Sequence, residues 1–352
     1  MRRFILALAA CAALFGGAAQ PAVAQSTAPA TDADFARQTN TWVTAIGSWA
    51  NSYNSIIYRQ AELLNALNEG AGKAFEFSEG RNARAGKAWA ATWAAEQRAT
   101  LAAIKADLAA LPRQPPSLKG PGYDLTGVPL YGRLSRGFER VPTMTDEMMA
   151  TVDALALKYI DATVRAAGGD EEAAGVLGIA FFDINIASWQ ADIKMLEGYL
   201  PLFEISPSLQ EQVTTTAIAL DRSLIAVFEI VRDDALGAPV DRAAAAARVR
   251  AQAALIDGDA AETAAGVVTL RRQASDPRAG ELGPKILAIG QAYDDGRAVM
   301  AELAGRLRSI ADGMDRGDAL DRDKLLEITE QIAPALEKFG ELDQRRKALL
   351  VQ

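Results

Sequence analysis

The chain contains no histidine, and its single cysteine, Cys11, lies within the first two dozen residues. These absences exclude Ser-His-Asp and Cys-His catalytic triads, histidine-ligated zinc or haem, and c-type haem attachment. If the N-terminal segment is removed, the mature chain has no thiolate and forms no disulfide. We therefore expect no cofactor and no metal site, and an enzyme is the least favoured class of function.

Beyond the N-terminus the chain lacks any run of about twenty apolar residues, the length that spans a bilayer. The N-terminus has the features of a secretory signal peptide: arginines at positions 2–3, an apolar run over 4–15 and a small-x-small cleavage site at 22–24. We expect cleavage near the Ala24–Gln25 bond and a periplasmic or secreted protein with no transmembrane anchor. A lipoprotein anchored at Cys11 is disfavoured because only seven apolar residues separate it from the arginines.

Positive charge is in deficit, with 37 basic against 45 acidic residues and a net charge of −8. Loss of the signal peptide with its two arginines lowers the net charge to −10. An acidic balance keeps a protein soluble and argues against nucleic acid as a partner. Half of the residues are apolar, and many of these are alanine, the strongest helix former.

The region 177–203 has the clearest periodic pattern in the chain. One apolar stripe advances in alternating steps of three and four residues, through Ile179, Phe182, Ile186, Trp189, Ile193, Leu196, Leu200 and Phe203. A second stripe follows another side of the same helix, through Leu177, Phe181 and Ile184, and resumes at Met195 and Tyr199. A helix that is apolar on two sides lies between neighbouring helices rather than at the surface.

The remaining patterns predict an all-α fold, an elongated bundle of about eight or nine helices. After a disordered tether at 25–31, a first helix begins near Asp32 and ends at Gly70 and Gly72, where glycine is typical of a helix C-terminus. Further helices are expected at 82–111, 145–167, 171–200, 206–236, 241–256, from 259 on, 284–312 and from 321 on. Between 112 and 142, prolines and glycines predict one long irregular loop.

Aromatic residues become scarce in the second half of the chain. All five tryptophans precede residue 190, and after Ser206 the aromatic residues are Phe228, Tyr293 and Phe339. This shift predicts an aromatic-rich lobe over 32–205 and an Ala/Leu-rich lobe over 206–352, although a single long bundle with two different ends fits as well. The alanine-rich helices also permit self-association.

Basic residues gather in and before the predicted loop. Between Lys73 and Arg140, eleven basic residues face six acidic ones, so this region is positive within an acidic chain. Arginines and aromatic rings on such a segment suit an anionic ligand or an acidic partner. The candidate partner-binding residues are Arg113, Lys119, Tyr123, Tyr131, Arg133, Arg136 and Arg140. The alternative is a solvated loop whose arginines pair with acidic helices and whose aromatic rings pack on a helix end.

Two other features offer weaker candidates. Asp183 lies on the helix that is apolar on two sides, where a carboxylate is costly unless an arginine pairs with it. Four tryptophans at helical spacing could line a pocket, although such residues more often form plain core: Trp42, Trp49, Trp89 and Trp93. We therefore favour a non-enzymatic exported protein that binds or scaffolds an envelope protein or an anionic envelope component. The alternative is an extracytoplasmic module that binds a small molecule or peptide, and the third hypothesis is an enzyme that relies on carboxylates.

Overall fold

The computed structural model describes residues 32–80, 82–205 and 209–318, and single helical positions between 327 and 345. Within them the long helices are α2 (Asp32–Glu79), α3 (Ala83–Ala110), α5 (Val141–Ala167), α6 (Glu171–Ile205), α7 (Gln210–Ala235), α8 (Arg242–Ala274) and α9 (Gly283–Arg316). The shorter elements are the hairpin strands β1 (Lys119–Gly120) and β2 (Tyr123–Asp124), the helix α4 (Pro129–Phe138) and the 3-10 turn η1 (Pro277–Leu282). The all-α multi-helix bundle is confirmed. The predicted signal peptide and tether at 1–31 lie outside the described residues.

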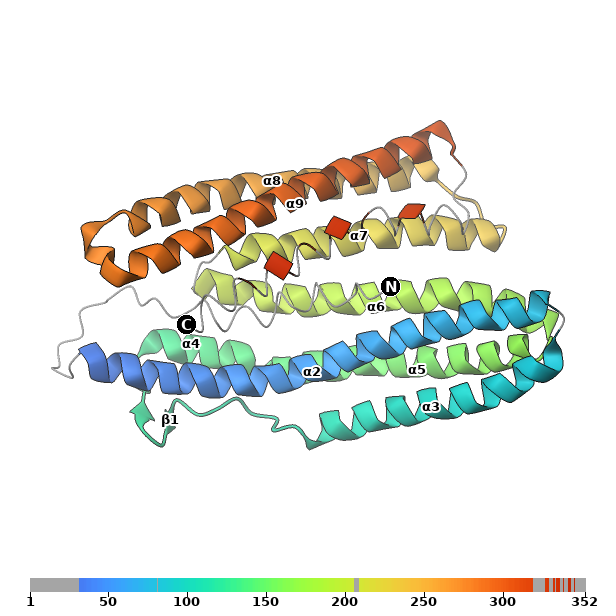
Figure 1. Cartoon of the computed structure of the whole chain (residues 1–352), viewed down its shortest axis with the longest axis horizontal. Helices are drawn as coiled ribbons and strands as arrows, with labels where there is room; N and C mark the ends of the chain where they lie inside the picture. Colours follow the sequence, from blue (N-terminus) through green and yellow to red (C-terminus); the bar gives the residue numbers. More distant parts are fainter. Residues whose placement is uncertain are drawn as a thin grey trace.

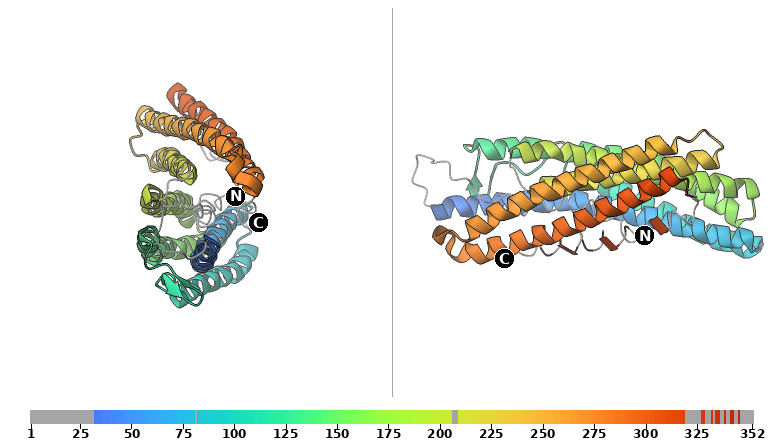
Figure 2. Two further views of the ribbon diagram at one scale, coloured as in Figure 1. Left: turned by 90° about the vertical axis from the view of Figure 1, so that its left-hand side faces the viewer. Right: turned by 90° about the horizontal axis from the view of Figure 1, so that it is seen from above.

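The long helices run roughly parallel to the longest axis of the molecule (Figure 1). Viewed from the end, they follow a curved row from α9 through α8, α7 and α6 to α5, and α2 and α3 turn back beside α5 (Figure 2). The small β1–β2 hairpin and α4 lie together near one end of the bundle (Figure 1). None of the described helices combines the length and the apolarity needed to cross a membrane.

Helix α6 contributes to two separate hydrophobic cores. Its residues Leu177, Ile184 and Leu196 are buried in a first core, which they share with α2, α3, α4 and α5. Three other residues of α6 are buried in a second core with α7, α8 and α9; they are Phe182, Ile186 and Trp189. The helix is therefore packed on two sides, and the first stripe enters both cores: Ile186 and Trp189 lie in the second core, whereas Leu196 lies in the first. The boundary near residue 205 between an aromatic-rich and an alanine-rich lobe stays a prediction.

Three of the helices are capped at their N-termini by a side chain that accepts a hydrogen bond from a backbone N–H group of the first turn. The side chain of Asn82 accepts from the N–H of Ala85 at the start of α3, and that of Asp241 accepts from the N–H of Ala244 at the start of α8. Asp170 does the same before α6, following a glycine with φ of 88° that separates α5 from α6. These short polar side chains replace the intrahelical acceptors that a first turn lacks.

The predicted irregular loop at 112–142 was partly wrong, because residues 129–138 form α4 and α5 already begins at Val141. Proline is tolerated at both helix starts, since the first turn needs no N–H donor. Gly137 inside α4 permits close packing, because a Cβ atom there would lie 2.0 Å from the Cδ2 atom of Leu202 in α6. The irregular segment is therefore confined to the stretch between Leu111 and Val128, and it contains the hairpin.

Three predicted helix boundaries were also wrong. Helix α6 continues past Pro201 to Ile205, because Leu202 and Phe203 are buried and their packing offsets the lost hydrogen bond. The two helices expected at 241–256 and from 259 on form the single helix α8, which lowers the number of helices slightly. Helix α2 passes through Gly70 and Gly72 and ends only at Glu79.

Gly70 allows a close approach of helices α2 and α3. A Cβ atom built at this position would lie 2.3 Å from the Cζ2 atom of Trp93, whereas one built at Gly72 would have no atom within 4 Å. We expect Gly70→Ala to lower the free energy of unfolding by about 1–3 kcal/mol, because the indole ring must move. Gly72→Ala, two residues away, should raise it by about 0.5–1 kcal/mol, because alanine is the better helix former.

Urea denaturation followed by circular dichroism measures both changes. Equal effects of the two substitutions would contradict the steric role of Gly70.

Candidate partner-binding surface

Buried aromatic side chains of α2 hold the segment that follows α3. The indole N–H of Trp49 and the hydroxyl of Tyr53 both donate to the carbonyl oxygen of Pro112, at 2.8 and 2.9 Å. The indole N–H of Trp42 donates to the carbonyl oxygen of Pro116 at 3.4 Å. A buried aromatic N–H or O–H requires an acceptor, and this backbone supplies it. These three contacts fix the irregular segment against α2.

Two of the seven predicted partner-binding residues are cations that form ion pairs within the chain. Both guanidinium nitrogens of Arg113 donate to the carboxylate of Asp146 in α5, at 3.0 and 2.5 Å. Lys119 pairs with Asp124 at 2.7 Å, directly opposite it in the hairpin. Hydrogen bonds from Lys119 and from Thr126 hold the pKa of Asp124 at about 2. Both cations are therefore paired with carboxylates of the same chain.

The two predicted tyrosines also have structural contacts. The hydroxyl of Tyr123 donates to the carbonyl oxygen of Ser117 at 3.0 Å, which closes the hairpin. Tyr131 is buried, the centroid of its ring lies 5.3 Å from that of Trp42 in an edge-to-face arrangement, and its hydroxyl is 3.3 Å from the hydroxyl of Thr39. Tyr131, with Leu134 and Phe138, forms the buried face of α4 that fastens it to the bundle.

The other three predicted residues lie together and are exposed. Arg133 and Arg136 project from α4, and Arg140 follows at the start of α5. Arg133 and Arg136 are three residues apart on the side of α4 away from its buried face, and Arg140 follows four residues after Arg136. In the part of the chain that the structure describes, no carboxylate pairs with any of them. We call this group the arginine face.

The tryptophan cluster is packed core in this structure. Trp42, Trp49 and Trp93 are each less than a tenth exposed, and the ring of Trp89 stacks on that of Trp93 with centroids 5.6 Å apart. Because the indole N–H groups of Trp42 and Trp49 are bound by the chain itself, this arrangement favours the core interpretation over a ligand pocket.

Asp183 has the arginine partner that its position required. The guanidinium of Arg232 in α7 lies 3.4 Å from the Asp183 carboxylate, which is 43% exposed. Arg232 also binds Asp233 at 2.9 Å. This ion pair bridges α6 and α7 near the surface, and Asp183 is not a candidate for acid–base chemistry.

Sequence reasoning missed two buried carboxylates, Asp192 in α6 and Asp221 in α7. Their residues are 6% and 5% exposed, and Oδ2 of Asp221 receives no hydrogen bond within the described residues. Burial raises the pKa of Asp192 to about 7. Burial and the nearby Asp192 raise the pKa of Asp221 well above its usual value. Both shifts favour the protonated, neutral form of these carboxyl groups, because burial and a neighbouring carboxylate penalise the charged form.

A buried network of polar side chains lies on the side of α6 that carries Asp192. The hydroxyl of Tyr159 donates to Oδ1 of Asn68 at 3.1 Å, and Nδ2 of Asn68 donates to Oδ1 of Asn185 at 3.4 Å. These bonds join α2, α5 and α6 inside the bundle. Asn185, Ser188 and Asp192 follow one another at steps of three and four residues.

Asn185, Ser188 and Asp192 occupy the positions at which the second apolar stripe is interrupted, between Ile184 and Met195. The interruption of that stripe was the signal in the sequence that polar residues were buried there.

Comparison of the chain with models of protein families, with curated proteins and with solved structures finds no match. The described residues also contain no group of three or more histidine, cysteine, aspartate or glutamate side chains arranged to hold a metal ion. The support for the arginine face as a binding surface therefore comes from its geometry and charge alone.

Proposed function

We propose that this protein is an exported, non-enzymatic helical scaffold that binds an acidic partner of the cell envelope through the arginine face. The observation that carries the proposal is the difference between the two groups of cations in residues 113–140. Arg113 and Lys119 are neutralised within the chain, whereas Arg133, Arg136 and Arg140 are exposed on one side of α4 and its continuation. The signal peptide at 1–24 supports the envelope as the compartment.

Three features of α4 suit this role. Its opposite side is buried through Tyr131, Leu134 and Phe138, so the arginines project from a fixed support. Guanidinium groups bind carboxylate and phosphate oxygens in a forked geometry, which favours acidic surfaces. The rest of the chain is acidic, so the arginine face also directs an acidic partner toward one end of the molecule.

The triple variant Arg133→Gln/Arg136→Gln/Arg140→Gln tests the proposal. We expect it to lose at least tenfold in affinity for the envelope components that the wild-type chain retains at low salt, because charged groups at an interface rim govern association. Retention from envelope extract at about 50 mM salt, elution at high salt and mass-spectrometric identification measure this difference. The melting temperature should stay within one or two degrees, since exposed unpaired arginines contribute little to stability.

A matched control is Arg84→Gln/Lys87→Gln at the start of α3, where two other cations are exposed. This control should retain the same components as the wild type. If the triple variant also retains them, the arginine face is not the binding surface.

A further inference from the structure

The methionines of this chain are unevenly distributed. Of the seven methionines, three lie within residues 144–149, and a fourth is Met195. Met144 and Met148 are four residues apart on α5, so they share one side of that helix. Met195 belongs to α6, which packs directly against α5.

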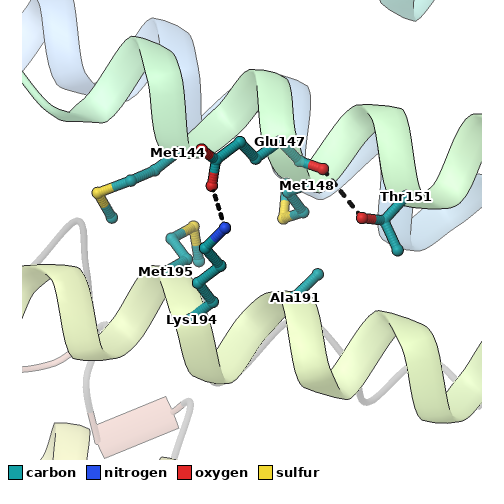
Figure 3. A pocket seen from close by; sticks show the side chains of 7 residues that line it. All are labelled: Met144, Glu147, Met148, Thr151, Ala191, Lys194 and Met195. Atoms are coloured by element: carbon teal, nitrogen blue, oxygen red, sulfur yellow. Dashed lines mark hydrogen bonds and ion pairs between the residues drawn. The ribbon is translucent and has the colours of Figure 1, made fainter.

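These three methionines line one pocket between α5 and α6 (Figure 3). The pocket has a volume of about 50 Å³, which is room for a single ion or for a few water molecules. Met148 and Met195 extend into the space between the helices from opposite sides, and Met144 lies at one end of it with its sulfur directed away from the other two (Figure 3). Met148 and Met195 are 3% and 2% exposed, whereas Met144 is half-buried.

One ion pair lies across the opening of the pocket. Lys194 of α6 binds Glu147 of α5, and their side chains are 69% and 48% exposed (Figure 3). Because this pair is solvent-exposed, it costs little to open. Once Lys194 swings away, the Glu147 carboxylate remains beside the pocket as an anion that can balance a bound positive charge.

The chemistry of the lining selects a particular kind of cation. Thioether sulfur is a soft, neutral ligand that prefers Cu⁺ and does not bind hard divalent ions such as Mg²⁺ or Ca²⁺. With no histidine in the chain and no cysteine after Cys11, methionine thioethers are the soft ligands of the folded part, and three of them line this pocket. Methionine has three rotatable side-chain bonds, so the half-buried Met144 can turn toward the other two sulfurs.

We propose that Met144, Met148 and Met195 form a binding site for a soft monovalent cation, Cu⁺ or its redox-inert analogue Ag⁺, with Glu147 as the adjacent counter-charge. The site is separate from the arginine face and does not depend on the proposed function. Binding involves no change in the oxidation state of the metal. It would stabilise the contact of α5 with α6, because an ion that binds the folded state preferentially raises the free energy of unfolding.

Titration of the mature chain with Ag⁺ tests the site, with the methyl groups of methionine followed by ¹³C NMR. We expect one equivalent of Ag⁺ to shift the signals of Met144, Met148 and Met195 and to leave those of Met300 and Met314 in place. We also expect saturable binding with a dissociation constant in the micromolar range or below, and a higher melting temperature with Ag⁺ than without.

The double variant Met148→Leu/Met195→Leu keeps the apolar volume and removes two of the sulfurs, so the fold should persist. We expect at least a tenfold loss of Ag⁺ affinity. The control Met300→Leu/Met314→Leu, in the second core, should bind Ag⁺ as the wild type does. Unsaturable binding, equal affinity in both double variants, or equal shifts at all methionines would show that these residues only fill the core.

Discussion

Replacement of Asp192 and Asp221 by asparagine is expected to raise the free energy of unfolding at pH 8 by roughly 2–4 kcal/mol. Burial raises the pKa values of both carboxyl groups in the folded chain, that of Asp192 to about 7, whereas an unfolded chain restores a value near 3.8. As the pH rises from 4 to 8, the unfolded chain therefore releases its protons first, and folding becomes less favourable. Asparagine has no carboxyl group to ionise, so it removes this loss.

Near pH 4 the same double variant should differ little from the wild type, because both carboxyl groups are then protonated in the folded chain. Urea denaturation at a series of pH values measures the difference. The matched control is Asp183→Asn on α6, the helix that also carries Asp192. The Asp183 carboxylate is 43% exposed and paired with Arg232. This control should change stability by less than about 1 kcal/mol at any of these pH values. A double variant without a pH-dependent gain would show that the buried pair is not the source of a proton linkage.

Ile186→Asp is expected to lower the free energy of unfolding by about 5 kcal/mol or more, which is comparable to the whole stability of many domains. Ile186 is 5% exposed, and an aspartate there leaves an unpaired charge in an apolar core. The two-lobe division predicted from the sequence assigns Ile186 to the aromatic-rich lobe over 32–205. The structure instead places Ile186 in the second core, with α7, α8 and α9.

Because α6 supplies residues to both cores, we expect the damage to reach the first core as well. In the background Trp189→Phe, the remaining tryptophans report on α2 and α3 alone; they are Trp42, Trp49, Trp89 and Trp93. Adding Ile186→Asp should shift the denaturation midpoint from tryptophan fluorescence and that from circular dichroism together.

The corresponding control in the first core is Leu196→Ala, which should cost about 2–5 kcal/mol and also shift both midpoints. A fluorescence midpoint that does not respond to Ile186→Asp would show that the two cores unfold independently.

Much of the fold follows from local patterns in the sequence. The two apolar stripes of 177–203 predicted a helix packed on two sides, and α6 has buried residues in two cores. Helix ends were less predictable. Gly70 does not end α2, because its missing side chain accommodates Trp93, and Pro201 does not end α6, because the following residues are buried. These exceptions depend on neighbours that are distant in the sequence.

The candidate binding residues were likewise predicted only in part from the sequence. Charge composition alone identified the basic region between Lys73 and Arg140, but it could not separate neutralised cations from free ones. That separation required Asp146 in α5 and Asp124 in β2 to be placed beside Arg113 and Lys119. The three arginines of the arginine face are then defined by the absence of such a neighbour among the described residues.

The sequence by itself determined that the protein is all-α, that residues 177–203 pack on two sides, and that the chain has no histidine and no cysteine after Cys11. These properties depend on composition and on a period of three to four residues, which a single chain segment already contains. Only the tertiary structure decided which carboxylates are buried together, which arginines remain exposed, and which methionines face one pocket. Each of these depends on side chains from different helices, and their separation in space is set by packing rather than by position along the chain.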